Sequence, residues 1–178
     1  MYGKFIDNIE VVDVSSKGKG ICKDESGKVI FVDGVVPGDI ITLKIKKKRK
    51  NYFEGQKIEI LKPSKNRITP KCKHFELCGG CKFQNLSYDA QLQFKQKQIL
   101  NNLKNFSEMN IPKISRIKKA NKIYFYRNKM EFSFSEKKWL TKEEINKKNQ
   151  NITRKGLGFH KSGAWNKVID ITKCHLQK

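Results

Sequence analysis

The chain has 178 residues, 37% of them hydrophobic, and a formal net charge of +22 at pH 7. This length allows one or two domains. The sequence has neither a signal-peptide pattern nor an apolar run of the roughly 20 residues that a membrane-spanning helix needs. Secreted and membrane-spanning classes are therefore excluded, and we expect a protein of the reducing cytoplasm without a membrane partner.

The positive charge lies mostly in the second part of the chain. Residues 1–62 carry 13 basic and 9 acidic side chains, whereas residues 63–178 carry 26 and 8. Such an excess attracts polyanions and releases condensed counterions when it meets nucleic acid. The charge therefore favours nucleic-acid binding, and the alternative is an AT-rich genome that raises the lysine content without function.

Residues 5–61 predict five short strands separated by turn signals. Ile41, Leu43 and Ile45 alternate with polar residues, which gives one apolar and one basic face. Pro37-Gly38-Asp39 is typical of a turn. The strands are expected at FIDNIEVVDV, GKGICKD, KVIFV, DIITLKIKK and YFEGQKIEIL. Five strands in about 60 residues favour a small closed barrel of the oligonucleotide-binding kind, because closure removes exposed edges.

A run of cations lies between the fourth and fifth of these strands. Its residues are Lys46, Lys47, Lys48, Arg49 and Lys50, and they are followed by Tyr52 and Phe53. Cations beside aromatic rings track phosphates and stack unpaired bases. We therefore expect RNA contacts here, with a solvated hairpin tip as the alternative.

The rest of the chain predicts one helix and several strands. The helix covers residues 87–106, with Ser87 as its N-cap and one apolar face made of Leu92, Ile99, Leu103 and Phe106. Strands are expected at residues 129–135, 156–160 and 167–171. Residues 141–151 have no apolar face and are expected to be solvated, whereas Phe75, Phe83 and Trp165 are expected in the core.

Three of the five cysteines lie within ten positions, and a fourth follows far along the chain. The local spacing is C-x5-C-x2-C. Structural zinc usually uses two tight pairs, whereas each iron of a [4Fe–4S] cluster takes one thiolate, so three local ligands and one distant ligand suit a cluster. The spacing favours a [4Fe–4S] cluster, with zinc or no metal as alternatives. Its ligands would be Cys72, Cys78, Cys81 and Cys174.

The residues around these cysteines refine the prediction. Gly79 and Gly80 would let the chain wrap closely with positive backbone angles. His74 and His175 neighbour the cysteines and are expected beside the site or exposed rather than as ligands. Cys22 lies in a predicted strand, where a free cysteine behaves as a small apolar core residue.

These residues together resemble the S-adenosylmethionine-dependent RNA uracil-5-methyltransferases, which carry an iron–sulfur cluster and an N-terminal TRAM barrel. The resemblance covers nearly the whole chain and is strongest at the CGGC core with its distant fourth cysteine. It consists of the barrel, Cys72, Cys78-Gly79-Gly80-Cys81, Phe83-Gln84, Tyr88-x-x-Gln91-Leu92-x-x-Lys95, Tyr126-Arg127-Asn128-Lys129, Leu157-Gly158-Phe159 and Val168-Ile169-Asp170-Ile171 before Cys174.

The resemblance implies an organisation and a function. The fold class it implies is mainly β with α: a five-stranded TRAM barrel at residues 1–62, then an α+β iron–sulfur domain at residues 63–90 and 125–178, with a Rossmann-like catalytic domain absent. Residues 91–124 are expected to pack on that absent domain or to form a dimer through their helix. Further RNA contacts are implied at Arg127, Asn128 and Lys129.

The expected function is that of the RNA-binding and cluster-binding half of such an enzyme, with ribosomal RNA preferred over transfer RNA. The chain alone would not methylate, because S-adenosylmethionine and the catalytic residues belong to the absent domain in this resemblance. The alternatives are a stand-alone iron–sulfur RNA-binding protein and a zinc-binding nucleic-acid module.

Overall fold

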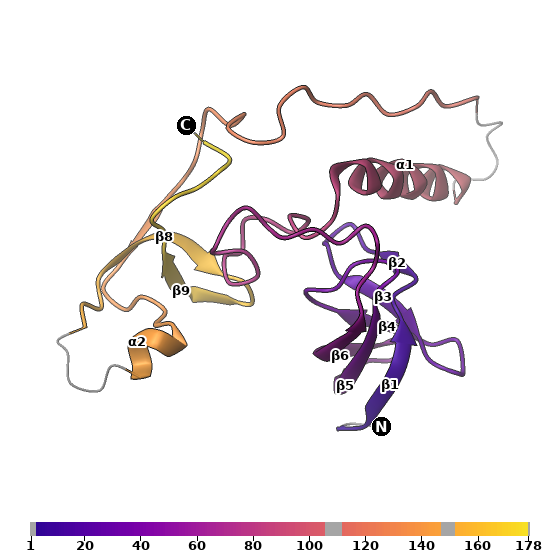
Figure 1. Cartoon of the computed structure of the whole chain (residues 1–178), viewed down its shortest axis with the longest axis horizontal. Coiled ribbons are helices and arrows are strands. Elements are labelled where there is room, and N and C mark those ends of the chain that lie inside the picture. The colour runs from indigo at the N-terminus through magenta and orange to yellow at the C-terminus, as the bar shows by residue number, and fades with distance from the viewer. Residues whose placement is uncertain (1–2, 106–111, 147–151, 178) are drawn as a thin grey trace. The chain divides into compact units, whose positions relative to one another are not determined.

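A computed structural model describes residues 3–105, 112–146 and 152–177 (Figure 1). The chain divides into two compact units. The first comprises Met1–Thr69 and Asn85–Lys119, and the second comprises Pro70–Gln84 and Ala120–Lys178. In the described residues, no helix is long and apolar enough to cross a membrane.

The first unit is built on a mixed six-stranded sheet with the order β1-β5-β6-β4-β3-β2 (Figure 1). Neighbouring strands are antiparallel except β4 and β6, which are parallel. The strands are β1 (Phe5–Glu10), β2 (Asp13–Val14), β3 (Gly20–Lys23), β4 (Val29–Val32), β5 (Ile40–Lys48) and β6 (Tyr52–Lys62).

The period of two in β5 has the expected consequence. Ile41, Leu43 and Ile45 are at most 2% exposed, and they join a hydrophobic cluster with Ile30, Val32 and other residues of the sheet. Cys22 lies fully buried in the same cluster, and burial, with a smaller contribution from the charge of Asp39, raises the pKa of its thiol to about 12.

The expected fold class had five strands in this sheet, and this number is wrong. Six strands form instead of five because the chain changes partners at Val11 and Val12. The amide of Val11 donates to the carbonyl of Asp39 at 2.9 Å, and that of Val12 donates to Ile21 at 2.8 Å. The first expected strand is thus divided into β1, which pairs with β5, and β2, which pairs with β3.

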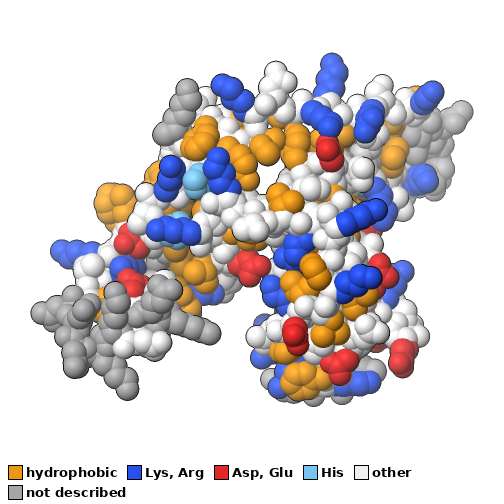
Figure 2. Space-filling model, viewed as in Figure 1, with side chains coloured by type: hydrophobic (Ala, Val, Ile, Leu, Met, Phe, Trp, Pro, Cys, Tyr) orange, Lys and Arg blue, Asp and Glu red, His pale blue; other side chains and the backbone are white. Residues whose placement is uncertain are grey.

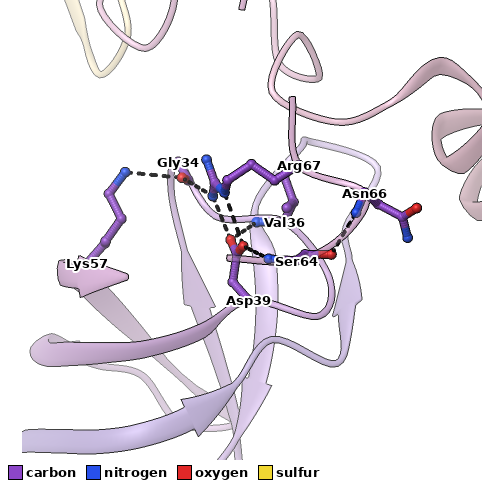
Figure 3. Close-up of polar contacts among 7 residues, drawn as sticks. All are labelled: Gly34, Val36, Asp39, Lys57, Ser64, Asn66 and Arg67. Carbon is purple, nitrogen blue, oxygen red and sulfur yellow. Dashed lines mark hydrogen bonds and ion pairs between the residues drawn. The ribbon is translucent and has the colours of Figure 1, made fainter. Parts of the chain in front are cut away.

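Asp39 organises the loop before β5. Its carboxylate is fully buried and accepts from the Arg67 guanidinium at 2.5 and 3.0 Å and from the amides of Val36 and Ser64 at 2.8 and 2.9 Å (Figure 3). Arg67 also donates to the carbonyl of Gly34 at 3.1 Å. Burial raises the pKa of Asp39, but these hydrogen bonds and the arginine charge outweigh it and hold the pKa below its usual range.

The helix α1 (Tyr88–Lys104) belongs to the first unit. Ser87 stands at the N-cap, as expected, but makes no side-chain capping bond. Ala90 and Leu92 are buried, and the ammonium of Lys97 lies 2.6 Å from the carboxylate of Asp13 in β2. Ile99 and Leu103 of the expected apolar face are 51% and 37% exposed, and Phe106 lies outside the described residues. The packing and dimerisation expected for residues 91–124 stay predictions.

The second unit contains a three-stranded antiparallel sheet in the order β7-β8-β9. Its elements are β7 (Ser133–Ser135), α2 (Lys142–Asn146), β8 (Gly156–Lys161) and β9 (Ala164–Asp170). Val168 and Ile169 on β9 are buried, whereas Phe134 on β7 is 86% exposed. The strand expected at residues 129–135 is therefore shorter than its alternation indicated, and its apolar face is largely open to solvent.

The segment 141–151, expected to be solvated, begins with α2. The hydroxyl of Thr141 accepts from the amide of Glu144 at 3.2 Å, and the carboxylate of Glu144 accepts from the amide of Thr141 at 2.9 Å. This reciprocal pair is a capping box, and it satisfies two donors at the helix start. Residues 147–151 lie outside the described residues.

Candidate functional site

The four cysteines expected to bind metal line one cavity in the second unit. The cavity has a volume of about 380 Å³. Cys72, Cys78 and Cys81 come from the loop of residues 70–84, and Cys174 follows β9. All four thiols are half-buried. The fold therefore brings the distant cysteine to the same cavity as the local trio.

The cysteine loop is fixed by main-chain hydrogen bonds to the turn between β8 and β9. The amide of Gly79 donates to the carbonyl of His160, and the amide of Ser162 donates to that of Leu77, each at 2.9 Å. A Cβ atom on Gly79 would lie 2.9 Å from the oxygen of His160. The close approach of the His160 main chain therefore explains why residue 79 is a glycine. The expected positive backbone angles are wrong, because neither Gly79 nor Gly80 has a positive φ.

The C-terminal segment carries Cys174 into place by pairing with residues 125–127. The amides of Phe125 and Arg127 donate to the carbonyls of His175 and Leu176, each at 2.9 Å. The ring of His175 meets Tyr124 and Phe125 edge-on. Two main-chain hydrogen bonds to the residues directly after Cys174 thus fix its position.

Nearby polar groups act directly on the sulfur atoms. The amide of Gly80 donates to Sγ of Cys78 at 3.4 Å, and the Gln84 side chain accepts from the amide of Cys72 at 3.1 Å. Burial raises the pKa values of Cys78 and Cys81, and the other cysteines raise them further. Hydrogen bonds from Gly80 and Gln84 oppose this shift, as does Arg127 for Cys81. Four thiolates here need compensating positive charge.

The cavity wall contains the residue type and number that a cluster would need. Four sulfur atoms around one cavity are the ligands that a [4Fe–4S] group uses. In the part of the chain that the structure describes, no group of three or more His, Cys, Asp or Glu side chains lies close enough to hold a metal ion. The nitrogen Nδ1 of His175, in the cavity wall, is buried and has no hydrogen-bond partner among the described residues. This nitrogen is a polar atom that a bound group could satisfy.

The basic segment expected to contact RNA lies at the β5–β6 turn. Its five cations are all exposed; they are Lys46, Lys47, Lys48, Arg49 and Lys50. Arg49 pairs with Glu54 at 3.0 Å. The ring of Phe53 is only 2% exposed and belongs to the hydrophobic core, so it is not free to stack on a base, and Tyr52 is half-buried edge-on against Phe31. The cations of this segment are thus better placed for RNA than its rings.

Arg127, Asn128 and Lys129 are exposed, and two of them flank the cysteines. Arg127 and Lys129 lie in the wall of the cysteine cavity, and Lys129 pairs with Glu131 at 3.0 Å. Figure 2 shows Lys and Arg side chains spread over one face of the chain, with fewer acidic side chains among them. The basic segment 127–129 and the cysteine cavity therefore share one surface of the second unit.

Sequence reasoning missed or misplaced three residues of the second unit. Gln84 was singled out only within a motif, although its side chain binds the cysteine loop. Trp165, expected in the core, is 83% exposed at the start of β9. Lys138, which has no signal in the sequence, is 7% exposed and pairs with Glu144 at 2.9 Å.

The comparison with protein families identifies the first part of the chain. Residues 7–58 match the model of the TRAM domain. This segment is a TRAM domain. It ends within β6, so the match covers the six-stranded sheet described above.

Curated relatives match almost all of the chain. An uncharacterized RNA methyltransferase of Bacteroides thetaiotaomicron is 43% identical over 164 residues, which are 92% of this chain and 36% of the relative. The 23S rRNA (uracil(1939)-C(5))-methyltransferase RlmD of Legionella pneumophila is 31% identical over 94% of this chain and 37% of its own length. The chain is homologous to RNA methyltransferases, and it spans just over a third of the length of these relatives.

A solved structure gives a weaker likeness. The Pyrococcus abyssi tRNA (uracil-54, C5)-methyltransferase in complex with S-adenosyl-L-homocysteine is 23% identical, with a TM-score of 0.49 over 96% of this chain and 33% of that chain.

The curated relatives and the sheet complete the correction of the fold class. The Bacteroides relative matches 92% of the chain, through both compact units. The described residues form a β-rich structure with a mixed sheet. The expected class, a five-stranded barrel followed by a separate α+β iron–sulfur domain, is therefore wrong.

Proposed function

We propose that this chain serves in the S-adenosylmethionine-dependent methylation of RNA at C5 of uracil. In this proposal the residues described here bind the RNA and hold a [4Fe–4S] cluster through Cys72, Cys78, Cys81 and Cys174. The observation that carries the cluster assignment is the convergence of these four thiols on one cavity of about 380 Å³. The homology to RNA methyltransferases supports the reaction.

The cluster would supply four iron–sulfur bonds that join the loop of residues 70–84 to the C-terminal segment. Gly80 and Gln84 orient the cysteine loop through the hydrogen bonds described above. The positive charges of Arg127, Lys129 and Lys173 line the same cavity and offset the charge of the four thiolates.

Ribosomal RNA is the substrate we favour. A TRAM domain precedes the cysteine loop, and the Legionella relative is named for a uracil of 23S rRNA. The target would lie in an irregular loop, since a base must leave its stack before a group can reach C5. The exposed cations Lys46–Lys50 and the pair Arg127 and Lys129 would meet the phosphates.

Metal analysis tests the cluster. Protein purified without oxygen should be brown and contain about four irons and four sulfides per chain. Cys81→Ala should lower both contents sharply, whereas Cys22→Ala, which alters the one cysteine buried in the hydrophobic cluster, should leave them unchanged. Stoichiometric zinc without inorganic sulfide would contradict the assignment.

Disrupting the gene tests the reaction. The strain should lose a 5-methyluridine from ribosomal RNA and regain it when the wild-type gene is restored. Loss from transfer RNA alone would contradict the preferred substrate, and an unchanged modification map would contradict the methyltransferase assignment.

A further inference from the structure

The hairpin of β8 and β9 carries an exposed tryptophan that the proposed function does not use. Trp165 is 83% exposed, although its indole is among the largest apolar side chains. Gly163, with φ of 77°, forms the turn just before it. The ring therefore stands at the end of the β8–β9 hairpin.

Two lysines line the same concave surface of the second unit as this ring, and the ammonium of one of them, Lys161, also lies 4.6 Å from the centroid of the Trp139 ring. The surface has a volume of about 540 Å³. It is lined by Trp165, Lys82, Lys161, His160, Gly79 and Gly80, among others, and no acidic residue among the described ones lines it. Lys82 donates to the Ser162 hydroxyl and Lys161 to the Ser162 carbonyl, each at 3.2 Å. Both cations are thus tethered at the turn.

A second exposed aromatic residue in the same sheet has different neighbours. Phe134 is 86% exposed, and the hollow beside it is lined by one acidic and one basic residue, Glu136 and Lys155. The two rings are thus similarly exposed, but the charged residues that line the hollow are balanced beside Phe134 and all positive beside Trp165. The charge distinguishes the Trp165 surface as a place for an anionic partner.

We propose that the concave surface around Trp165 binds single-stranded RNA, with the indole stacked on one unpaired base and Lys82 and Lys161 on the flanking phosphates. This inference rests on the RNA binding of the proposed function and adds a specific contact to it. An aromatic face beside two cations is the arrangement that binds single strands without reading their sequence. A duplex would offer the phosphates but not the base face.

The same surface adjoins the cysteine loop. Gly79 and Gly80 line it, and Cys78 forms a β-bridge with Lys161. The loop that holds the thiols therefore also positions the turn that carries Trp165. An RNA strand on this surface lies next to the cluster ligands, which gives the cluster site a role in shaping the RNA contact.

Binding to two RNA probes tests the proposal. A fluorescein-labelled 12-nucleotide single strand and the same sequence as a duplex are titrated with the whole chain, and anisotropy is measured. Trp165→Ala should weaken binding to the single strand about five- to tenfold, the effect of losing one stacked base, and change duplex binding less than twofold. Trp165→Phe should restore most of the affinity, and Phe134→Ala should have no effect.

The outcomes separate this inference from the proposed function. If the wild-type chain binds both probes with a steep salt dependence and Trp165→Ala binds as well as wild type, the stacking site is overturned and RNA binding stands. The stacking site would also be overturned if Trp165→Ala lost affinity equally for both probes. The same holds if Trp165→Phe, with unchanged iron content, did not restore the affinity for the single strand. Wild-type chain that binds neither probe would overturn RNA binding itself. A glutamate 12-mer that displaces the single strand as well as unlabelled RNA does would overturn the choice of partner.

Discussion

The two compact units use cysteine in opposite ways. In the first, Cys22 is fully buried in a hydrophobic cluster, and burial raises the pKa of its thiol to about 12. In the second, four half-buried cysteines surround a cavity that polar and charged residues also line. The first thiol is a core group, whereas the other four line a cavity and are the ligands that we propose.

This difference in the use of cysteine follows from the different sizes of the hydrophobic cores of the two units. Nearly all the buried apolar side chains belong to the first unit; among the described residues of the second, they are Val168 and Ile169. A small core supplies little stability, and small domains often add metal–ligand bonds. We therefore expect the second unit to depend on its thiol ligands and the first unit not to.

The largest expected effect comes from removing a cysteine ligand. Cys78→Ala should prevent the proposed cluster from binding and make the amides of the second unit exchange with solvent quickly, while those of β3 to β6 stay protected. Hydrogen exchange with mass spectrometry measures both units at once. Cys22→Ala should give the reverse pattern, a modest loss in the first unit alone. Uniform protection in the Cys78 variant would remove the distinction between the units.

The next effect concerns the ion pair that fixes the first unit. Arg67→Ala leaves the buried carboxylate of Asp39 without its charged partner, and losing one member of a buried pair costs about 3–5 kcal/mol of unfolding free energy. Urea unfolding measures it. The control is Lys19→Ala, which removes the exposed pair with Asp33 and should cost about 0.5 kcal/mol. Equal losses would mean that the buried pair has no special role.

The sequence predicted the elements whose signals are local. The alternation in β5, the turn before it and the spacing of the cysteines each depend on residues near one another in the chain. The partners of Asp39 could not be predicted in this way. Arg67 lies 28 positions away, so the aspartate resembled an ordinary turn residue.

Burial was predicted least well, because it depends on tertiary packing. Phe53 and Trp165 are both aromatic residues in strands, yet the first is 2% exposed and the second 83%. Phe53 lies on the face of β6 that covers the core, whereas Trp165 lies at the end of a hairpin. The capping box of Thr141 and Glu144 had a readable signal, T-x-x-E, which was overlooked because the segment lacks an apolar face.

A smaller effect is expected at this capping box. Thr141→Ala removes the hydroxyl that accepts from the amide of Glu144 and should cost about 1 kcal/mol of stability in the second unit. Thermal unfolding followed by near-ultraviolet circular dichroism of that unit's aromatic residues measures the loss. Thr141→Ser keeps the hydroxyl and should retain most of the stability. If serine and alanine destabilise alike, the hydroxyl is not the cause.

The last prediction concerns how the stability that the Asp39–Arg67 pair provides depends on pH. Little change with pH is expected near neutrality, so the test lies in acid. Hydrogen bonds from Arg67, Val36 and Ser64 hold the pKa of Asp39 below its usual range, although burial opposes them. A lowered pKa means that the folded state favours the ionised carboxylate. The resulting stability is fully present at pH values above the pKa of an aspartate in the unfolded chain, about 3.9. It is lost as the pH falls through the pKa of Asp39 in the folded state.

The unfolding free energy of the wild type minus that of Asp39→Asn should therefore be constant from pH 8 to pH 5. It should shrink below about pH 4, where the unfolded carboxyl takes up its proton first. Urea titrations at each pH measure this difference, and the subtraction removes the contributions of exposed acids such as Asp24. A difference that grew as the pH fell would mean that burial dominates and that Asp39 is protonated in the folded protein, which would contradict its pairing with Arg67.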